Sequence, residues 1–327
     1  MGGDFAPVAP VGGALLALAE LGAEHRIQLI GRTADVSAAL DNAVAGEFAE
    51  FAPVRARIDV VDAPDLVAMA DKPTAVMRRP RSSMAVGLRR VADGAADGFV
   101  SAGNTGAQMA ASVQLLGLHG GLKRPAIGTI FPTALHTVVV LDSGANVDCS
   151  AEELVHFARL GLVYAEDILG RTNPAVGLLS IGEEPEKGNA AVKEANKLLA
   201  QSGLHFIGNV EGRDVAAGSC ARGTFDVVVC DGFTGNVILK FYEGLAPTLI
   251  RMIAASTNAD PLELMKGLAH LDYSNYGGAP LLGVKGVSII AHGSSSPRAI
   301  KNAVNVAVRA AESRMSEHIG RRLGAQD

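Results

Sequence analysis

The sequence contains no tryptophan, and aromatic residues make up only 4% of its 327 positions. Side chains that could stack on nucleic-acid bases are therefore scarce. The formal net charge of −5 provides no basic field that would hold a phosphate backbone. Together these two features argue against a nucleic-acid-binding protein.

Cysteine is also rare, with only Cys149, Cys220 and Cys230 in the chain. Their spacing matches no metal-binding motif, and an odd, sparse number argues against a disulfide framework. We expect a reducing cytoplasm and no bound metal. Cys149 or Cys230 could act as an acyl-enzyme nucleophile, but buried, unreactive cysteine is the commoner case.

Long hydrophobic runs are missing as well. Residues 5–19 are apolar, but they include Pro7 and Pro10, follow no basic segment and are too short to span a bilayer. No other segment qualifies. We therefore expect neither a signal peptide nor a membrane-spanning helix.

The chain is instead rich in small and aliphatic residues, and 48% of its positions are hydrophobic. Apolar, strand-like runs alternate with helical patterns, and the helices include 14–21, 33–40 and 299–318. The strand-like runs are 27–30, 58–61, 98–100, 137–141, 176–181, 225–230 and 287–291. This order predicts an α/β fold, a three-layer αβα arrangement around a mostly parallel sheet. Residues 1–327 form one domain in this interpretation, with two lobes as an option.

The beginning of the sequence is unusual. Residues 1–4 (Met-Gly-Gly-Asp) resemble the loop that follows a strand, although no strand-like run stands before them. We therefore expect that a first strand of the sheet is missing from this chain.

Five of the predicted strands are followed by glycine-rich loops that carry Asn, Ser or Thr. In open α/β sheets, ligands bind beyond the carboxyl ends of the strands, where glycines let backbone N–H groups approach an anion. Any one such loop could be an ordinary turn, but five at the same end of the strands favour an anion site. None fits a nucleotide-binding fingerprint. The candidate substrate-binding residues in these loops are Asn104, Thr105, Gly106, Asn146, Gly188, Asn189, Asp231, Thr234, Gly235 and Ser294.

Two further polar residues stand out in the same loops. Lys187 comes just before a predicted helix and could pair with an anion as a point charge, or it could be a solvated surface lysine. His292 follows a predicted strand and could be a general base or a structural turn residue.

Short motifs in order along nearly the whole chain carry a family resemblance. They are 1–5 (MGGDF), 82–84 (SSM), 101–107 (SAGNTGA), 144–149 (GANVDC), 182–189 (GEEPEKGN), 208–214 (GNVEGRD), 230–236 (CDGFTGN), 281–286 (LLGVKG) and 291–296 (AHGSSS). With these motifs the chain resembles the bacterial phosphate acyltransferases, the PlsX family.

The resemblance implies transfer of a fatty acyl group from acyl carrier protein to inorganic phosphate, for phospholipid synthesis. It also implies a fold like those of isopropylmalate dehydrogenase and phosphate acetyltransferase, a homodimer, and no metal or cofactor. A cytoplasmic location with peripheral membrane association, next to a membrane glycerol-3-phosphate acyltransferase, is implied too. Lys187 and Asn236 take the catalytic positions, and Glu211 joins the candidate substrate-binding residues.

Three other functions stay open at this point. A phosphate acetyltransferase-like enzyme would use coenzyme A thioesters instead of acyl carrier protein. A non-catalytic module could bind acyl carriers at membranes. A dehydrogenase of the related fold would need a dinucleotide fingerprint and metal-binding carboxylates, which the sequence lacks.

Two surfaces could serve these partners. Five arginines could dock an acidic carrier protein, or they could be a solvated helix face; they are Arg78, Arg79, Arg81, Arg89 and Arg90. Residues 241–271 predict a helical hairpin for membrane contact, core packing or a dimer interface. Its apolar positions are Leu245, Leu249, Met252 and Ile253 in the first helix and Leu262, Met265, Leu268 and Leu271 in the second.

Overall fold

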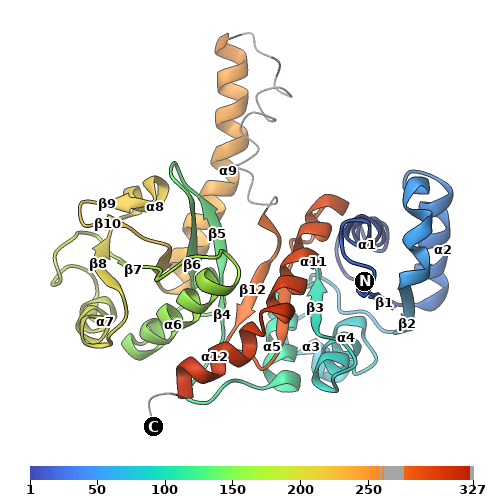
Figure 1. Ribbon diagram of the computed structural model, residues 1–327, viewed down its shortest axis with the longest axis horizontal. Helices are drawn as coiled ribbons and strands as arrows, with labels where there is room; N and C mark the ends of the chain where they lie inside the picture. Colours follow the sequence, from blue (N-terminus) through green and yellow to red (C-terminus); the bar gives the residue numbers. More distant parts are fainter. Residues whose placement is uncertain (258–259, 261–275, 325–327) are drawn as a thin grey trace. The chain divides into compact units, whose positions relative to one another are not determined.

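In a computed structural model, residues 1–257, 260 and 276–324 are described, and the chain divides into two compact units. Unit 1 comprises residues 1–118 and 276–316, and unit 2 comprises residues 119–275 and 317–327. Both contain helices around mostly parallel strands, so the predicted α/β class is confirmed (Figure 1).

Unit 1 contains two small sheets. Strands β1 (Ile27–Gly31) and β2 (Ile58–Asp62) pair in parallel. Strand β3 (Gly98–Ser101) pairs in parallel with β13 (Val287–Ile290), which also pairs antiparallel with β12 (Ala279–Leu282). The parallel pair β3 and β13 places the residues that follow both strands at the same end.

Seven helices and helical turns surround these sheets. They are α1 (Val8–Glu20), α2 (Thr33–Ala45), η1 (Ala49–Arg57), α3 (Ala75–Arg78), α4 (Ser83–Ala92), α5 (Thr105–Leu116) and α11 (Pro297–Glu312). Helices α1 and α11 lie side by side (Figure 1). A Cβ atom on Gly13 would lie 2.5 Å from Ile300, so glycine is what permits this close packing.

A cavity of about 720 Å³ lies within unit 1 between β1 and β3. Helices α1 and α11 and residue Met1 also line it. Burial lowers the pKa of the Met1 amino group.

Unit 2 is built on a five-stranded sheet in the order β5-β6-β11-β7-β8. Strands β6 (Thr137–Leu141), β11 (Val227–Val229), β7 (Val176–Leu179) and β8 (Phe206–Val210) are parallel. The edge strand β5 (Thr129–Pro132) runs antiparallel to β6. The remaining strands are short: β4 (Ala126–Ile127), β9 (Ser219–Cys220) and β10 (Gly223–Thr224).

Helices cover both faces of this sheet, which gives unit 2 its three layers. Helices α6 (Ala151–Asp167) and α7 (Ala190–Gln201) pack together, and α6 contacts β6 and β11. On the opposite face, α8 (Gly212–Ala217) and the first turns of α9 (Gly232–Thr257) pack on a buried apolar cluster.

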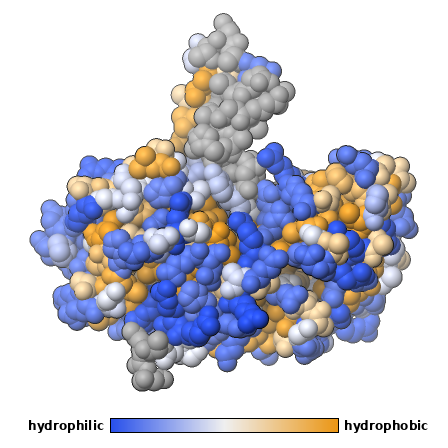
Figure 2. Space-filling model, viewed as in Figure 1, coloured by the Kyte–Doolittle hydropathy of each residue, from blue (hydrophilic) through white to orange (hydrophobic). Residues whose placement is uncertain are grey.

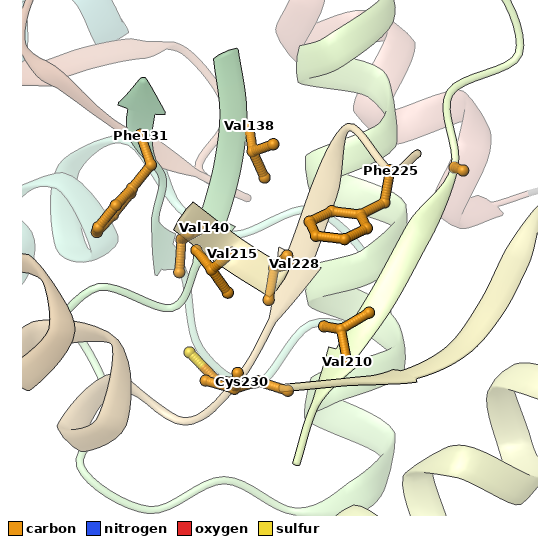
Figure 3. Packing of buried hydrophobic residues seen from close by; sticks show 10 residues of the cluster. Phe131, Val138, Val140, Val210, Val215, Phe225, Val228 and Cys230 are labelled. Carbon is orange, nitrogen blue, oxygen red and sulfur yellow. The ribbon is translucent and has the colours of Figure 1, made fainter. Parts of the chain in front are cut away.

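Figure 3 shows this cluster, in which strand residues such as Val138, Val140 and Val228 meet Phe225 and Val215. Alternate residues of β6 point to the other face, where Leu141 lies against Gly161 of α6. A strand buried on both faces needs apolar residues at every position, and this explains the continuous apolar runs in the sequence.

Helix α9 is longer than the sequence predicted. The hairpin was expected over 241–271, but its first helix begins at Gly232, so the predicted loop 231–236 is mostly the start of a helix. Hydrophobic surface is visible along this helix (Figure 2). Its exposed apolar side chains, 37–67% exposed, are Phe233, Val237, Phe241, Leu245, Leu249, Met252 and Ile253. We call this set the α9 stripe. The second helix of the predicted hairpin, with Leu262, Met265, Leu268 and Leu271, lies outside the described residues.

Other predicted boundaries were also wrong, and the helix expected over 14–21 begins at Val8. The helix expected over 299–318 is broken into α11 and α12 (Met315–Gly324), because Arg314 between them has a φ of 53°. Strand β7 ends at Leu179, and Ile181 is exposed. None of the helices in the described residues is both long enough and apolar enough to cross a membrane.

Candidate active site

The sheet of unit 2 brings four polar segments to one edge. Strand β11 pairs in register with both β6 and β7, and β7 pairs with β8. The segments that follow these parallel strands therefore start at the same edge. They are residues 142–148 after β6, 180–189 after β7, 211–214 after β8 and the first turn of α9 after β11. The catalytic candidates Lys187 and Asn236 belong to two of them.

Lys187 has an exposed side chain with no ion pair to any residue that the structure describes. Its backbone N–H donates to the carbonyl oxygen of Glu184 at 3.0 Å, which closes the turn that presents it. Gly188 follows with a φ of +102°, and a Cβ there would lie 2.6 Å from Val192. Glycine therefore allows the loop to turn sharply into α7 while the lysine faces solvent.

Asn189 caps α7. Its Oδ1 accepts a hydrogen bond from the backbone N–H of Val192 at 2.9 Å. This carbonyl oxygen is thus used in capping, although it was a candidate for substrate binding.

Glu211 has an ionic partner of its own. Its carboxylate lies 3.0 Å from Nε of Arg213, and its backbone N–H donates to Asp214 at 2.8 Å. A carboxylate repels phosphate, so Glu211 is better suited to stabilising the start of the neighbouring helix α8 than to binding an anion.

Asp231 and Thr234 form the cap of α9. The carboxylate of Asp231 accepts hydrogen bonds from the backbone N–H of Thr234 at 2.8 Å and from its hydroxyl at 3.0 Å. The N–H of Gly235 donates to the carbonyl of Asp231 at 3.0 Å. Gly235 was a candidate for substrate binding, and its N–H donor is used within the helix.

Asn236 lies exposed one residue further along α9. A Cβ on Gly144 would lie 3.5 Å from both Cβ and Oδ1 of Asn236, so the amide stands beside the loop after β6. Among the described residues its side chain has no hydrogen-bond partner. Its amide N–H₂ is thus available to a ligand.

Asn146 has no such freedom. It is buried, and its Nδ2 donates to the carbonyl of Pro125 at 2.8 Å and to Asp142 Oδ2 at 3.0 Å. Both amide hydrogens are used, so Asn146 stabilises its loop and offers no donor to a substrate.

The partner of Asn146, Asp142, was not singled out from the sequence, although it directly follows an apolar strand. Its carboxylate is fully buried and accepts several hydrogen bonds from the loop. Burial raises the pKa of Asp142, while its hydrogen bonds from Ala145, Ile127 and Asn146 act in the opposite direction. Since this carboxylate takes the N–H groups of Gly144, Ala145 and Asn146, they cannot also bind phosphate.

The cysteines of unit 2 are poor nucleophiles. Burial, with a further contribution from the charge of Asp142, raises the pKa of the Cys149 thiol to about 12. Burial likewise raises the pKa of Cys230. Both thiols are therefore protonated near neutral pH, and this argues against a covalent acyl-cysteine.

The other candidates lie in unit 1, after β3 and β13. Asn104 is buried, caps α5 through Ala107, and donates from Nδ2 to the carbonyl of Asp71 at 2.8 Å. Thr105 and Gly106 form the first turn of α5, where the Thr105 side chain is exposed. Asn104 thus supports the turn, and Thr105 and Gly106 present polar groups at a helix N-terminus.

Ser294 and His292 form an exposed pair after β13. The Ser294 hydroxyl and Nδ1 of His292 are 2.7 Å apart, and the Ser294 N–H lies 3.3 Å from the same nitrogen. No cluster of three metal-binding side chains occurs in the part of the chain that the structure describes.

Three members of the arginine cluster already have partners. Arg79 donates to Asp71 and to the carbonyl of Leu66, Arg89 to Ala85 and Arg90 to Gln28. Arg78 and Arg81 are exposed and form no ion pair within the described residues. The basic surface open to a partner is therefore smaller than the five arginines in the sequence suggest.

Comparisons with known proteins agree with this fold. A branched-chain phosphotransacylase from Enterococcus faecalis superposes with a TM-score of 0.60 at 14% identity, covering 95% of this chain and 96% of that one. The phosphate acyltransferase of Desulfitobacterium hafniense is 45% identical over 99% of this chain and 95% of its own length. That of Heliobacterium modesticaldum is 46% identical over 94% of this chain and 91% of its own length.

A family model described as fatty acid synthesis protein matches residues 1–318. Near-complete coverage at this identity leaves no large segment of the chain outside the relationship. The chain belongs to the phosphate acyltransferase family.

Proposed function

We propose that this protein transfers a fatty acyl group from acyl carrier protein to inorganic phosphate, giving acyl phosphate for phospholipid synthesis. Acyl transfer to phosphate follows from membership of the family. The carrier, the chain length of the acyl group and the catalytic residues are the finer parts of the proposal. Residues 1–327 act in it as one functional domain.

The observation that carries the catalytic assignment is the shared sheet edge in unit 2. Lys187 and Asn236 follow β7 and β11, which pair with each other, and both side chains are exposed and without partners in the described residues. A cation and an amide donor at one edge suit a substrate with anionic oxygens.

The reaction needs few groups beyond these. A phosphate oxygen attacks the thioester carbonyl carbon, the carbonyl oxygen becomes an oxyanion, and the C–S bond then breaks to release the carrier thiolate. A thiol with a pKa of about 8.5 leaves readily, and phosphate is already an anionic nucleophile. Lys187 stabilises charge on phosphate or the oxyanion, and Asn236 donates a hydrogen bond to it.

Four candidates remain as substrate-binding positions, namely Thr105, Gly106, Gly188 and Ser294. The side-chain groups of Asn104, Asn146, Asn189, Asp231, Thr234 and Glu211 are used within the protein, so they shape the loops. Ser294 stays a candidate together with His292.

Turnover tests this assignment. Lys187→Ala and Asn236→Ala should each lower kcat by about 100- to 1,000-fold, the loss expected for one oxyanion-stabilising donor. Lys193→Ala is the matched control, since Lys193 is an exposed lysine on the adjacent helix α7. Acyl phosphate is detected by mass spectrometry. Folded Lys187 and Asn236 variants with wild-type turnover would show that the two residues are not catalytic.

The same assay separates the alternatives. Faster turnover with acetyl-coenzyme A than with long-chain acyl carrier protein would indicate a phosphate acetyltransferase-like enzyme. Binding of acyl carrier protein without any acyl phosphate would indicate a non-catalytic module.

Carrier docking is proposed at Arg78 and Arg81. Both are exposed without ion-pair partners among the described residues, and an acidic carrier would be steered toward them by charge. Reversal of both to glutamate should raise the KM for acyl carrier protein at low salt. Reversal of Arg26, an exposed arginine paired with Asp59, is the control.

Membrane contact and homodimerisation are proposed at the α9 stripe. Exposed apolar residues at i, i+4 spacing along one helix favour contact with a second surface that buries them, either another copy of the protein or a bilayer. Such a peripheral location in the cytoplasm would allow delivery of the amphiphilic product to a membrane glycerol-3-phosphate acyltransferase.

Substitution of Leu249 and Met252 by glutamate tests the end of the stripe. Membrane contact predicts that this variant stays dimeric and active but no longer sediments with anionic liposomes. Dissociation to monomers with liposome binding retained would assign this part of the stripe to the dimer interface.

A further inference from the structure

The buried carboxylate of Asp142 organises the loop that follows β6. Its Oδ1 accepts backbone hydrogen bonds from Ile127 at 3.0 Å, Gly144 at 3.2 Å and Ala145 at 3.1 Å. Its Oδ2 accepts from the N–H of Asn146 at 2.6 Å and from the side-chain amide of the same residue at 3.0 Å. Five donors converge on one fully buried side chain, so the loop is folded around it.

The backbone of this loop also supports the first turn of α9. A Cβ on Gly235 would lie 1.9 Å from the carbonyl oxygen of Asp142, so helix and loop are in direct contact. The N–H of Gly232 donates to the carbonyl of Asn146 at 2.7 Å. The thiol of Cys230 lies 3.6 Å from the same Asp142 carbonyl. The helix therefore starts on a surface that Asp142 holds in shape.

Asn236 is the next residue after Gly235, and its side chain lies beside Gly144. Gly144 has a φ of +128°, a conformation that other residues rarely adopt, and Asp142 stabilises it through the Gly144 N–H. The loop thus limits both the backbone position and the side-chain space of Asn236.

We propose that Asp142 is a positioning residue that acts through Asn236. Its carboxylate fixes the loop 142–146, and the loop fixes the first turn of α9 that presents the Asn236 amide. This inference rests on the proposed function, because it assumes that Asn236 stabilises charge in the acyl transfer. Asp142 itself is buried and does not touch the substrate.

A double-mutant cycle tests this link. Asp142→Asn replaces one acceptor oxygen by an NH₂ group that faces N–H donors, so the loop should lose its shape. We expect kcat to fall at least about 10-fold, with the KM for phosphate changed less. In the Asn236→Ala background the same change should have little further effect, since residues that act as a unit are not additive.

Asp226→Asn is the matched control. Asp226 precedes β11, at the opposite end of that strand from α9, and accepts a hydrogen bond from Ala175 at 3.1 Å. Asp226 also lies 3.3 Å from Nε of Arg171, so its substitution removes a carboxylate acceptor and weakens an ion pair without touching the loop. We expect its effect on turnover, if any, to add to that of Asn236→Ala.

A second measurement does not depend on activity. Cys230 is buried beneath this contact, and its alkylation rate can be followed by mass spectrometry of the peptide that contains it. Asp142→Asn should accelerate alkylation of Cys230, whereas Asp226→Asn should leave it slow. If Asp142→Asn does not fold, Gly144→Ala probes the same contact between loop and helix.

The proposal is overturned if Asp142→Asn, or Gly144→Ala in its place, keeps wild-type kcat. The proposal is equally overturned if the fold-loss of kcat caused by this substitution simply multiplies with the fold-loss caused by Asn236→Ala. Wild-type turnover of Asn236→Ala alone would count against the proposed function instead. In that case Cys230 alkylation still decides whether Asp142 holds the start of α9, with an unchanged rate refuting it.

Discussion

Two of the three glycines in helix α9, Gly235 and Gly244, should respond in opposite ways to the same substitution. A Cβ on Gly235 would lie 1.9 Å from the carbonyl oxygen of Asp142 and 3.1 Å from Sγ of Cys230. A Cβ on Gly244 would have no neighbour within 4 Å among the described residues. The first position is closed to a methyl group, and the second is open.

The expected magnitudes follow from these distances. A Cβ essentially never comes closer than 3.0 Å to another heavy atom, so Gly235→Ala must push helix and loop apart by about 1 Å. Overpacking of this kind costs about 1–3 kcal/mol of unfolding free energy. Gly244→Ala should instead stabilise the helix by about 0.5–1 kcal/mol, because alanine loses less backbone entropy than glycine.

Catalysis should separate the two variants further. A misplacement of about 1 Å at a reacting group can cost about 100-fold in rate. Since Asn236 follows Gly235 directly, Gly235→Ala should lower kcat by about that factor, while Gly244→Ala keeps wild-type turnover.

Urea unfolding followed by circular dichroism measures the stability, because the chain has no tryptophan to report by fluorescence. Trapping of acyl phosphate with hydroxylamine measures turnover. Equal unfolding midpoints and equal kcat values for the two alanine variants would refute the close contact between α9 and the loop after β6.

Three further predictions concern other parts of the molecule. Cys149→Ser and Cys230→Ala should keep turnover, whereas loss of activity in a folded variant would indicate an acyl-cysteine. The hydrogen bond from Lys301 (2.8 Å) lowers the pKa of Glu20. The interaction therefore stabilises the folded protein at pH values above the ordinary carboxylate pKa, and this stabilisation is lost as the pH falls through the lowered pKa. Glu20→Gln should therefore cost about 0.2–1 kcal/mol in urea unfolding at pH 7 and nothing at acid pH. Phe225→Ala, in the core of unit 2 (Figure 3), should cost about 3–5 kcal/mol, and a smaller loss would show that the core collapses around the cavity.

The sequence alone determined the α/β class and the family. Continuous apolar runs such as 137–141 form strands that are buried on both faces of the sheet. This burial requires an apolar residue at every position, so the sequence shows it directly. The strand-end loops were visible for a similar reason, since sharp turns require glycine. The motifs extend along nearly the whole chain, and relatives at 45% identity agree with them.

Only the tertiary structure decided which polar groups in those loops are available. Asn104 and Asn146 are both asparagines in glycine-rich loops, yet their amide hydrogens are used by residues as distant in sequence as Asp71 and Pro125. Asn236 has no such partner among the described residues. Hydrogen-bond partners far apart along the chain leave no local pattern in the sequence.

The same reason explains why Asp142 was overlooked and why Arg78 and Arg81 are distinguished from the other arginines. A side chain's burial and its partners depend on elements that meet only after folding. Residue type and spacing therefore predicted where the candidate site lies along the chain, whereas contacts between loops and helices decided which residues can act there and which ones hold them in place.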